Sequence, residues 1–283
     1  MPARIDLHTH SDCSDGLLSP AALVALAAQR QVELLALTDH DSLEGCKAAG
    51  DACAAAAIQF VPGTELSCQW REREIHVVGL GLDIADAALL AHCGAMLELR
   101  RERIRAMTQR LERAGLPGQA LAALALNAKL PTRTHLARAL CQLDIAASVQ
   151  QAFDRWLKRG RPGYVSAQWP TLDTAVRHIL GAGGIAVLAH PHRYPVSNGT
   201  LRELAADFKT AGGEGIEVSL PGMSLAEADR AARLARSVGL AGSIGSEFHE
   251  PDLPWRPLGR FAKLPDLVTP IAERFVASAI RAG

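Results

Sequence analysis

The 283-residue sequence lacks the features that mark membrane, secreted and nucleic-acid-coating proteins. No uncharged run reaches the roughly 18 apolar residues that a transmembrane helix requires, and the chain passes from Met1 into a predicted strand without an apolar signal region. Its 30 basic and 30 acidic residues cancel, so the overall charge indicates neither a nucleic-acid nor a membrane partner. We therefore expect a cytoplasmic protein without membrane contact, and no obligate protein partner is evident.

Cysteine pairs and a dinucleotide fingerprint are also missing. The six cysteines include no Cys-x-x-Cys pair, which favours reduced thiols that mostly fill the core, in a reducing compartment. No Gly-x-Gly-x-x-Gly motif follows the first predicted strand, so a dinucleotide-binding fold lacks its main signature.

Short apolar strands and amphipathic helices alternate in two parts of the chain. After the opening strand, the pattern predicts a closing helix at 270–281 and strands at 34–38, 58–67, 75–78, 184–190, 215–220 and 240–246. Repeated βα units predict an α/β fold with a parallel sheet covered by helices. The sheet is either a barrel or an open doubly wound sheet, and we favour the barrel.

The strand signals disappear between residues 85 and 163. Four helices are predicted there instead, at 89–114, 119–129, 132–142 and 148–159. An all-helical stretch within a βα alternation is typical of an insertion. We therefore expect three segments: the first part of the barrel at 1–84, a helical insertion (cap) domain at 85–163, and the second part of the barrel at 164–283.

Imidazoles and carboxylates follow several of the predicted strands. His8 and His10 are two residues apart, so an extended strand places both on one face. The other candidates come from separate strands, nearly all at or just past the carboxyl end, and these ends meet at one face of a barrel. The nine candidate metal ligands are His8, His10, Asp15, His40, Glu65, His76, His190, Glu247 and His249.

Nine nitrogen and oxygen ligands exceed the needs of one ion and suffice for two or three. Because no cysteine is required, the set favours Mn²⁺, Zn²⁺, Fe²⁺ or Mg²⁺ over a thiolate site. Asp39 and Asp41 flank His40, and we expect them to orient imidazoles as second-layer partners.

The motifs that carry these residues resemble the successive motifs of the polymerase and histidinol phosphatase (PHP) family: DLHTHS at 6–11, TDHD at 38–41, GTE at 63–65, IH at 75–76, AHP at 189–191 and GSEFH at 245–249. The resemblance spans nearly the whole chain. TRTH at 132–135, FDRWL at 153–157 and GRPGYV at 160–165 resemble the subgroup of 3′,5′-nucleoside bisphosphate phosphatases and related 5′–3′ exoribonucleases, the RNase AM-like proteins.

This resemblance implies a distorted (β/α)₇ barrel with a trinuclear centre of three divalent ions, expected to be Mn²⁺, that cleaves phosphoesters. It implies one ion on His8, His10, Glu65 and Glu247, a second on Glu65, His76 and His190, and a third on Asp15, His40 and His249. We expect His8, His10, Glu65, His190 and Glu247 to be catalytic. The family pattern has Asp where this chain has Glu247, and the extra methylene shifts the carboxylate by about one C–C bond.

A second phosphate requires its own cationic site. Guanidinium groups bind phosphate oxygens in pairs, so we expect substrate contacts from Arg100, Arg101, Arg103, Arg133, His135 and Arg193. Thr132 is a predicted N-cap that would place Arg133 and a helix amino terminus near an anion. The alternative for the arginine run is a solvated helix face, and residues 100 and 101 cannot share one side.

We therefore predict a phosphatase that removes the 3′-phosphate from nucleoside 3′,5′-bisphosphates, converting adenosine 3′,5′-bisphosphate (pAp) to AMP and phosphate. The same site would cleave short RNA from its 5′ end. One alternative is a histidinol-phosphate-type small monoester phosphatase. Another is a metal-dependent amidohydrolase, although no lysine lies on the predicted strands for a bridging carboxylated lysine. A non-catalytic nucleic-acid binding module is the third, against which the zero net charge argues.

Overall fold

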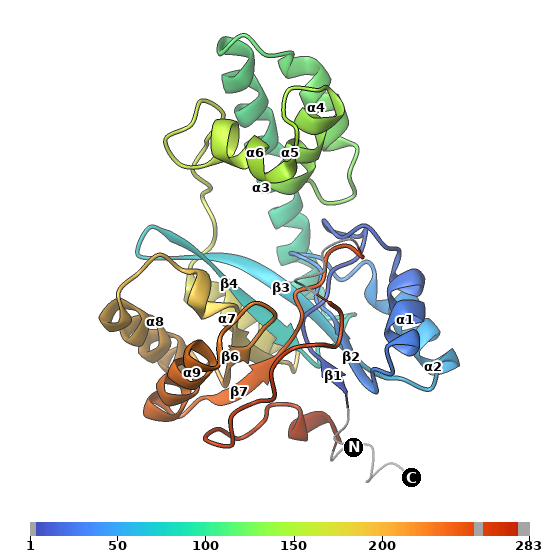
Figure 1. The fold of residues 1–283 in the computed structure, drawn as a ribbon, viewed down its shortest axis with the longest axis vertical. Coiled ribbons are helices and arrows are strands. Elements are labelled where there is room, and N and C mark those ends of the chain that lie inside the picture. Colours follow the sequence, from blue (N-terminus) through green and yellow to red (C-terminus); the bar gives the residue numbers. More distant parts are fainter. Residues whose placement is uncertain (1–3, 252–256, 277–283) are drawn as a thin grey trace.

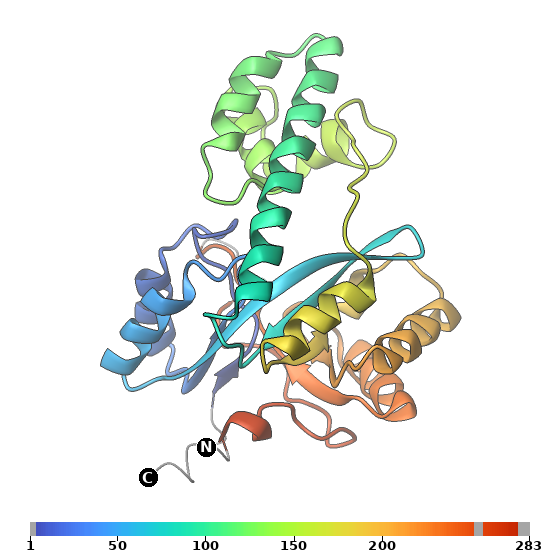
Figure 2. The same ribbon diagram turned by 180° about the vertical axis from the view of Figure 1, so that it is seen from behind.

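The computed structural model describes residues 4–251 and 257–276. Seven strands form one sheet that curls into a nearly closed barrel, with helices around it and a helical lobe beyond one end (Figures 1 and 2). The strands neighbour one another in chain order: β1 (Ile5–Asp6), β2 (Leu34–Leu37), β3 (Gln59–Trp70), β4 (Arg73–Leu80), β5 (Ile185–Leu188), β6 (Gly215–Ser219) and β7 (Ala241–Ile244). The predicted α/β barrel is confirmed.

The edge strands β1 and β7 are brought together by hydrogen bonds of the residues that follow them. The Leu7 N–H donates to the Ile244 carbonyl at 3.2 Å, and the Glu247 N–H donates to the His8 carbonyl at 2.7 Å. A parallel bridge joins Thr9 to Phe248. The first and last motifs of the sequence are therefore neighbours in space.

The expectation of an all-parallel sheet is wrong at β4. This strand is antiparallel to β3 and to β5, because a tight turn at Arg71 and Glu72, both with positive φ (47° and 62°), joins β3 directly to it. The amino half of β4, which carries His76, therefore lies at the end of the barrel where the other strands finish. β3 extends past its pairing with β2 and delivers Glu65 there, bridged to His40.

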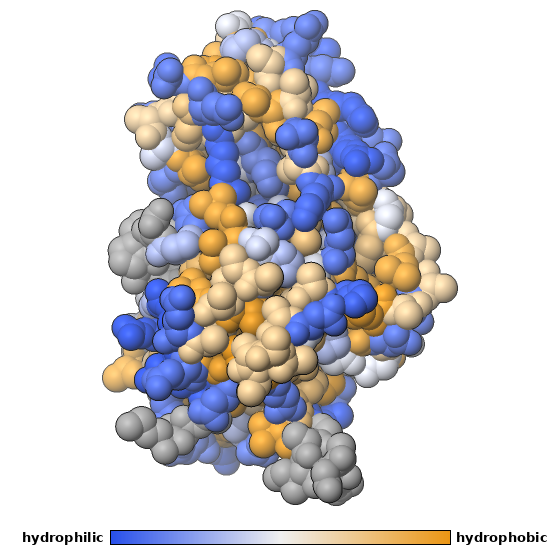
Figure 3. Space-filling model, turned by 90° about the vertical axis from the view of Figure 1, so that its right-hand side faces the viewer, coloured by the Kyte–Doolittle hydropathy of each residue, from blue (hydrophilic) through white to orange (hydrophobic). Residues whose placement is uncertain are grey.

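Apolar side chains on alternate positions of the strands separate the barrel interior from its outer layer. Leu34 and Ala36 point into an interior cluster with Val61, Val78 and Val187. Leu35 and Leu37 pack outward against α1 (Pro20–Gln29) and α2 (Cys46–Ala55). The remaining outer helices are α7 (Leu172–Gly181), α8 (Asn198–Thr210) and α9 (Leu225–Val238). Figure 3 views the side that carries α1 and α2, where pale apolar surface reflects their alanine-rich sequences.

The helical lobe consists of α3 (Ala87–Arg113), α4 (Gly118–Leu126), α5 (Arg133–Gln142), α6 (Val149–Ala152) and a π-helical turn (Phe153–Leu157). Ile104, Met107, Leu121, Leu136 and Leu140 are buried in a hydrophobic cluster of its own. The amino half of α3 packs instead on the barrel, where Leu89 joins the cluster beneath α7. One long helix therefore crosses from barrel to lobe (Figure 2).

No helix within residues 4–251 and 257–276 combines the length and the apolarity that a membrane crossing demands. The helix predicted at 270–281 lies partly outside the described residues, which end at 276; positions 273–276 are helical.

Candidate active site

Imidazoles and carboxylates from most of the strands meet at the end of the barrel that faces the lobe. Three groups of side chains have ligand atoms within 4.8 Å of one another and could hold a metal ion. They are His8, His10 and Glu65; His40, Glu65 and His76; and His10, Asp15, His40 and His249. We call these residues, together with His190, the imidazole–carboxylate cluster.

Glu65 lies at the centre of this cluster and is fully buried. Its Oε1 is 2.8 Å from His76 Nδ1 and 2.8 Å from His190 Nε2. Its Oε2 is 3.0 Å from His40 Nδ1 and 3.3 Å from His8 Nε2. One carboxylate thus contacts imidazoles from four segments of the chain, the arrangement that a bridging metal ligand requires.

The donor set fits divalent cations. His8 Nε2 and His10 Nε2 lie 3.0 Å apart, so two ring nitrogens face each other at a distance that needs a proton or a cation between them. Glu65 Oε2 and Asp15 Oδ1 are buried oxygens that accept no hydrogen bond from the described residues, whereas buried polar atoms are normally satisfied. Histidine and carboxylate ligands suit Mn²⁺, Fe²⁺ and Zn²⁺.

Backbone conformation also singles out this end of the barrel. Asp41, His190 and Glu247 have φ of 41°, 29° and 48°, in the left-handed region where non-glycine residues are strained and often functional. Gly245 lies against His8: a Cβ there would be 2.4 Å from the His8 Cβ. The glycine therefore allows the loop after β7 to close over the first strand.

Charge within the cluster is divided between ionised carboxylates and imidazoles. Burial disfavours the charged form of His8, but the carboxylates of Glu217 and Glu65 outweigh it and raise the pKa of His8 to about 10. Burial lowers the pKa of His190 to about 4. Although burial opposes ionisation of Glu65 and Asp15, neighbouring imidazoles hold the pKa of both carboxyls well below the usual range.

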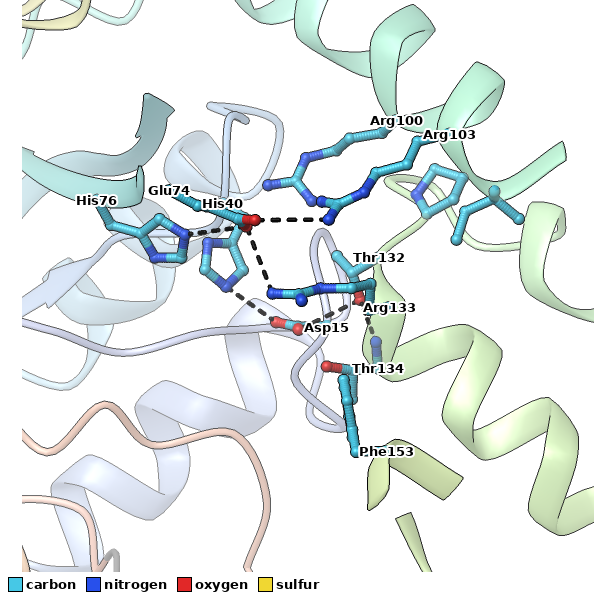
Figure 4. A pocket seen from close by; sticks show the side chains of 12 residues that line it. Asp15, His40, Glu74, His76, Arg100, Arg103, Thr132, Arg133, Thr134 and Phe153 are labelled. Carbon is cyan, nitrogen blue, oxygen red and sulfur yellow. Dashed lines mark hydrogen bonds and ion pairs between the residues drawn. The ribbon is translucent and has the colours of Figure 1, made fainter. Parts of the chain in front are cut away.

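A small pocket lies between the cluster and the lobe, with a volume of about 90 Å³ (Figure 4). Glu74 is its central acceptor: Oε2 is 3.5 Å from Arg103 Nη2, and Oε1 is 3.4 Å from Arg133 Nη2 and 3.8 Å from His76 Nε2. We call this site the arginine pocket. Because His76 lines it and also contacts Glu65, the pocket adjoins the cluster directly.

The amino terminus of α5 forms another wall of the arginine pocket. Thr132 is its N-cap, as predicted, and a capping box pairs the Thr132 hydroxyl and N–H with residue 135. The same hydroxyl lies 3.3 Å from Asp15 Oδ2. The helix amino terminus therefore faces the cluster, with Arg133 and Thr134 along the wall (Figure 4).

Comparison with known proteins agrees with these features. Residues 6–159 match the model of the PHP domain, and the chain is 42% identical to the 3′,5′-nucleoside bisphosphate phosphatase of Chromobacterium violaceum over 99% of both chains. This protein belongs to the PHP family. The predicted resemblance is thereby confirmed.

Other relatives of this PHP protein extend the comparison. It is 39% identical to a 5′–3′ exoribonuclease of Haemophilus influenzae, covering 97% of this chain and 100% of that one. The solved structure of an amidohydrolase from Chromobacterium violaceum, with bound sulfate and no metal, superimposes with a TM-score of 0.91 at 41% identity, covering 97% and 96% of the two chains. A structure from Bifidobacterium adolescentis, 22% identical with a TM-score of 0.81 and covering 100% of this chain and 97% of that one, supports the fold alone.

The structure does not bring all predicted site residues of this PHP protein into the cluster or the pocket. The Glu247 carboxylate pairs with Arg193 and is outside the three groups. Arg100 lines the arginine pocket, but its guanidinium donates to Asp41 Oδ2 at 2.6 and 2.8 Å. Arg101 pairs with Glu98 on the outer side of α3, about 100° around the helix from its neighbour.

His135 is bound within the lobe. Its Nδ1 accepts the Thr132 N–H at 3.1 Å, so the ring completes the capping box. The idea that Asp39 and Asp41 orient imidazoles is wrong. Asp39 accepts hydrogen bonds from Ser11 and Ser14, and Asp41 accepts them from the Ser67 N–H and an arginine.

Two carboxylates were missed by sequence reasoning. Glu217 is buried in β6, with Oε1 2.8 Å from His8 Nδ1 and Oε2 accepting the His190 N–H at 2.5 Å. Glu74 lies two positions before the predicted ligand His76 in the sequence. An acidic residue in the otherwise apolar run GIEVS was a signal for Glu217, whereas Glu74, near a strand end, had no comparable signal.

Proposed function

We propose that this PHP protein is a metal-dependent phosphoesterase that removes the 3′-phosphate from nucleoside 3′,5′-bisphosphates, giving a 5′-mononucleotide and phosphate. The observation that carries the proposal is the contact between the imidazole–carboxylate cluster and the arginine pocket through His76. A ligand with two phosphates can then occupy both. The Chromobacterium relative, named for this activity, is similar over its full length, which supports the same reaction here.

We propose the same site for 5′–3′ cleavage of short RNA, because an internucleotide phosphate is also attached to a 3′-oxygen. The similarity to a named 5′–3′ exoribonuclease supports this second activity. It is a diester cleavage, so the site must also accept a nucleoside beyond the scissile phosphate.

Three divalent ions are proposed to occupy the cluster, with Mn²⁺ the first to test and Zn²⁺, Fe²⁺ or Mg²⁺ as alternatives. When bound, such ions supply Lewis acidity and an activated water for attack on phosphorus. The proposed ligands are the cluster residues, with Glu65 shared between two ions and Glu247 as an added ligand of the first. Because Glu247 Oε2 pairs with Arg193, Arg193 competes with a metal ion for this carboxylate.

The residues of the arginine pocket are proposed to hold the 5′-phosphate. Arg103 and Arg133 already converge on one carboxylate, Glu74, and a phosphate dianion would attract both more strongly than that carboxylate does. The amino terminus of α5 adds backbone N–H groups of the kind that bind anions. Residues 85–163 are proposed to act as a cap domain, since they supply this wall.

The alternatives differ in what they require of the site. Histidinol phosphate carries one phosphate and an amine. The two arginines beside the cluster, Arg103 and Arg133, suit a substrate with a second anionic group better than one with an amine. An amidohydrolase with a carboxylated lysine would need a lysine on a strand, and β1 to β7 carry none within the described residues.

The test is release of phosphate or mononucleotide from pAp, a 5′-phosphorylated dinucleotide and histidinol phosphate, side by side with Mn²⁺. We expect the highest kcat/KM for pAp, with measurable cleavage of the dinucleotide. Faster release from histidinol phosphate would contradict the proposal. Glu65→Ala should lose bound Mn²⁺, measured by elemental analysis, together with activity, and full turnover without metal would refute the role of the cluster.

A further inference from the structure

A groove separate from the arginine pocket lies between α8 and α9, which are adjacent on the outside of the barrel (Figure 1). Its volume is about 350 Å³, within the roughly 300–1,000 Å³ of pockets that hold small ligands. Both helices follow strands that end at the face of the cluster. The groove is lined by the first turns of α8 and by residues along most of α9, from Glu227 to Ser237. We call it the α8–α9 groove.

The groove adjoins the imidazole–carboxylate cluster through Tyr194. This side chain lines the groove, and its hydroxyl accepts the His76 N–H at 2.9 Å. Its ring lies 5.7 Å from the His190 ring, in an edge-on contact. The α8–α9 groove therefore reaches the cluster at Tyr194, which contacts both His76 and His190.

The lining of the groove combines an apolar floor with a cationic rim. Pro191, Val196, Leu201, Ala231 and Leu234 supply apolar surface, and the rim carries Arg202, Arg230 and Arg233. An apolar floor can take a nucleobase, and an arginine at the edge can take a phosphate of the nucleic-acid backbone.

Two of the three rim arginines are available to a ligand. Arg233 pairs with Asp229. Glu227 faces Arg230, but its carboxylate already accepts the N–H and the hydroxyl of Ser224 at 2.8 and 2.7 Å in the capping box of α9. Within the described part of the chain, Arg202 and Arg230 form no ion pair, and both are exposed.

We propose that the α8–α9 groove binds the second nucleotide of a 5′-phosphorylated oligoribonucleotide, with the base on the apolar floor and the following phosphate at Arg202 and Arg230. This inference rests on the proposed function. With the 5′-phosphate in the arginine pocket and the scissile phosphate at the cluster, the next nucleoside needs another surface beside the cluster, and the groove supplies one at Tyr194, which contacts His76 and His190.

The polarity of the bound chain agrees with the chemistry of the cleavage. Water adds to the phosphorus, the bond between phosphorus and the 3′-oxygen of the first nucleotide breaks, and that oxygen gains a proton. The phosphate stays on the 5′-oxygen of the second nucleotide. The shortened chain therefore leaves with a new 5′-phosphate, and the groove holds this product rather than the released mononucleotide.

The test compares a substrate that reaches the groove with one that does not. The double variant Arg202→Ala/Arg230→Ala should raise the KM for 5′-phosphorylated tetraadenylate by about tenfold or more, whereas kcat/KM for pAp should stay within about twofold. Losing the site for this one phosphate should also flatten the dependence of log affinity on log salt by about 0.7, the contribution of each neutralised phosphate of a single strand. Arg236→Ala, on the same helix but outside the groove, is the matched control.

Binding is measured separately by fluorescence anisotropy of the tetranucleotide, labelled at its 3′ end, in EDTA so that no cleavage occurs. A wild-type KM and affinity in the double variant, or an equal loss with pAp, would overturn the inference while leaving the proposed function intact. If the wild-type protein cleaves neither substrate with Mn²⁺, the proposed function fails, and the anisotropy comparison still decides whether the groove binds RNA.

Discussion

Glu217 connects the segments that follow β1 and β5, each of which carries a cluster residue. One carboxylate oxygen is 2.8 Å from His8 Nδ1 and the other accepts the His190 N–H at 2.5 Å. A single side chain therefore orients the ring after the first strand and the strained turn after the fifth. Carboxylates that hold the far nitrogen of a ligating histidine fix its orientation and raise its basicity.

Glu217→Gln retains the size of this side chain but removes its charge, so His8 loses a partner that favours a fixed ring orientation. We expect Mn²⁺ affinity to fall by about 10- to 100-fold, the range typical of such partners. Isothermal titration with Mn²⁺ measures the change. The control is Glu214→Gln, because the Glu214 side chain is partly exposed and pairs with Arg274. Unchanged affinity in the Glu217 variant would mean that this residue has only a structural role.

Arg133 differs from the other arginines of the lobe because it combines a place in the pocket with a position at the first turn of α5. Arg133→Ala removes a charged hydrogen-bond donor, worth about 1.5–3 kcal/mol. We expect kcat/KM for pAp to fall by at least about tenfold, whereas p-nitrophenyl phosphate, which lacks a second phosphate, should change little. Arg105→Ala, on the exposed side of α3, is the control, and equal losses for both substrates would contradict a 5′-phosphate site.

At the scale of elements, the loop after β7 must lie directly on the residue after β1. A methyl group at Gly245 would meet the His8 Cβ at 2.4 Å, a distance at which the backbone has to move. His8 is one partner in this contact, and Glu247 follows Gly245 by two residues. A shift of either backbone segment would therefore displace a proposed metal ligand.

Gly245→Ala should therefore destabilise the protein by about 1–3 kcal/mol, as overpacking does, and lower its Mn²⁺ content. Urea unfolding and elemental analysis measure the two effects. Gly94→Ala is the matched control, because a Cβ there has no neighbour within 4 Å and alanine favours the helix. Wild-type stability and metal content in Gly245→Ala would show that the loop tolerates displacement.

At the scale of the whole molecule, α3 joins the helical lobe to the barrel, and Arg100 makes a buried polar contact between this helix and the barrel. The guanidinium is bound to Asp41 Oδ2 and to Ser67 Oγ, with side-chain exposures of 8% for Arg100 and 0% for Asp41. Arg100 therefore holds the lobe in place, which explains why it is less available to a substrate phosphate than its position in sequence predicted.

Arg100→Ala leaves the Asp41 carboxylate buried without its partner, and breaking such a pair costs about 3–5 kcal/mol. We expect a loss of this size in the free energy of unfolding from denaturant titration. Arg101→Ala removes only a partly exposed pair with Glu98 and should change stability by less than about 1 kcal/mol. Similar values for the two variants would contradict the role of Arg100 as the connection between lobe and barrel.

Much of the architecture was predictable because its signals are local. Apolar runs marked the strands, the Thr132 N-cap is where the sequence placed it, and the histidines that follow strands lie in one cluster. The direction of β4 was not predictable in the same way: residues 71 and 72 form a two-residue turn in positive φ without glycine, so the usual turn signal was missing.

The sequence by itself determined which side chains are available for chemistry and which strands carry them, because residue type and the period of burial are properties of short segments. Only the tertiary structure decided which arginines reach the site and which carboxylates support it. Arg100, Arg101 and Arg103 lie within one turn of α3 but are bound to Asp41, Glu98 and Glu74. The local sequence determines the face of the helix on which each arginine lies, whereas the residue that each face contacts depends on long-range packing.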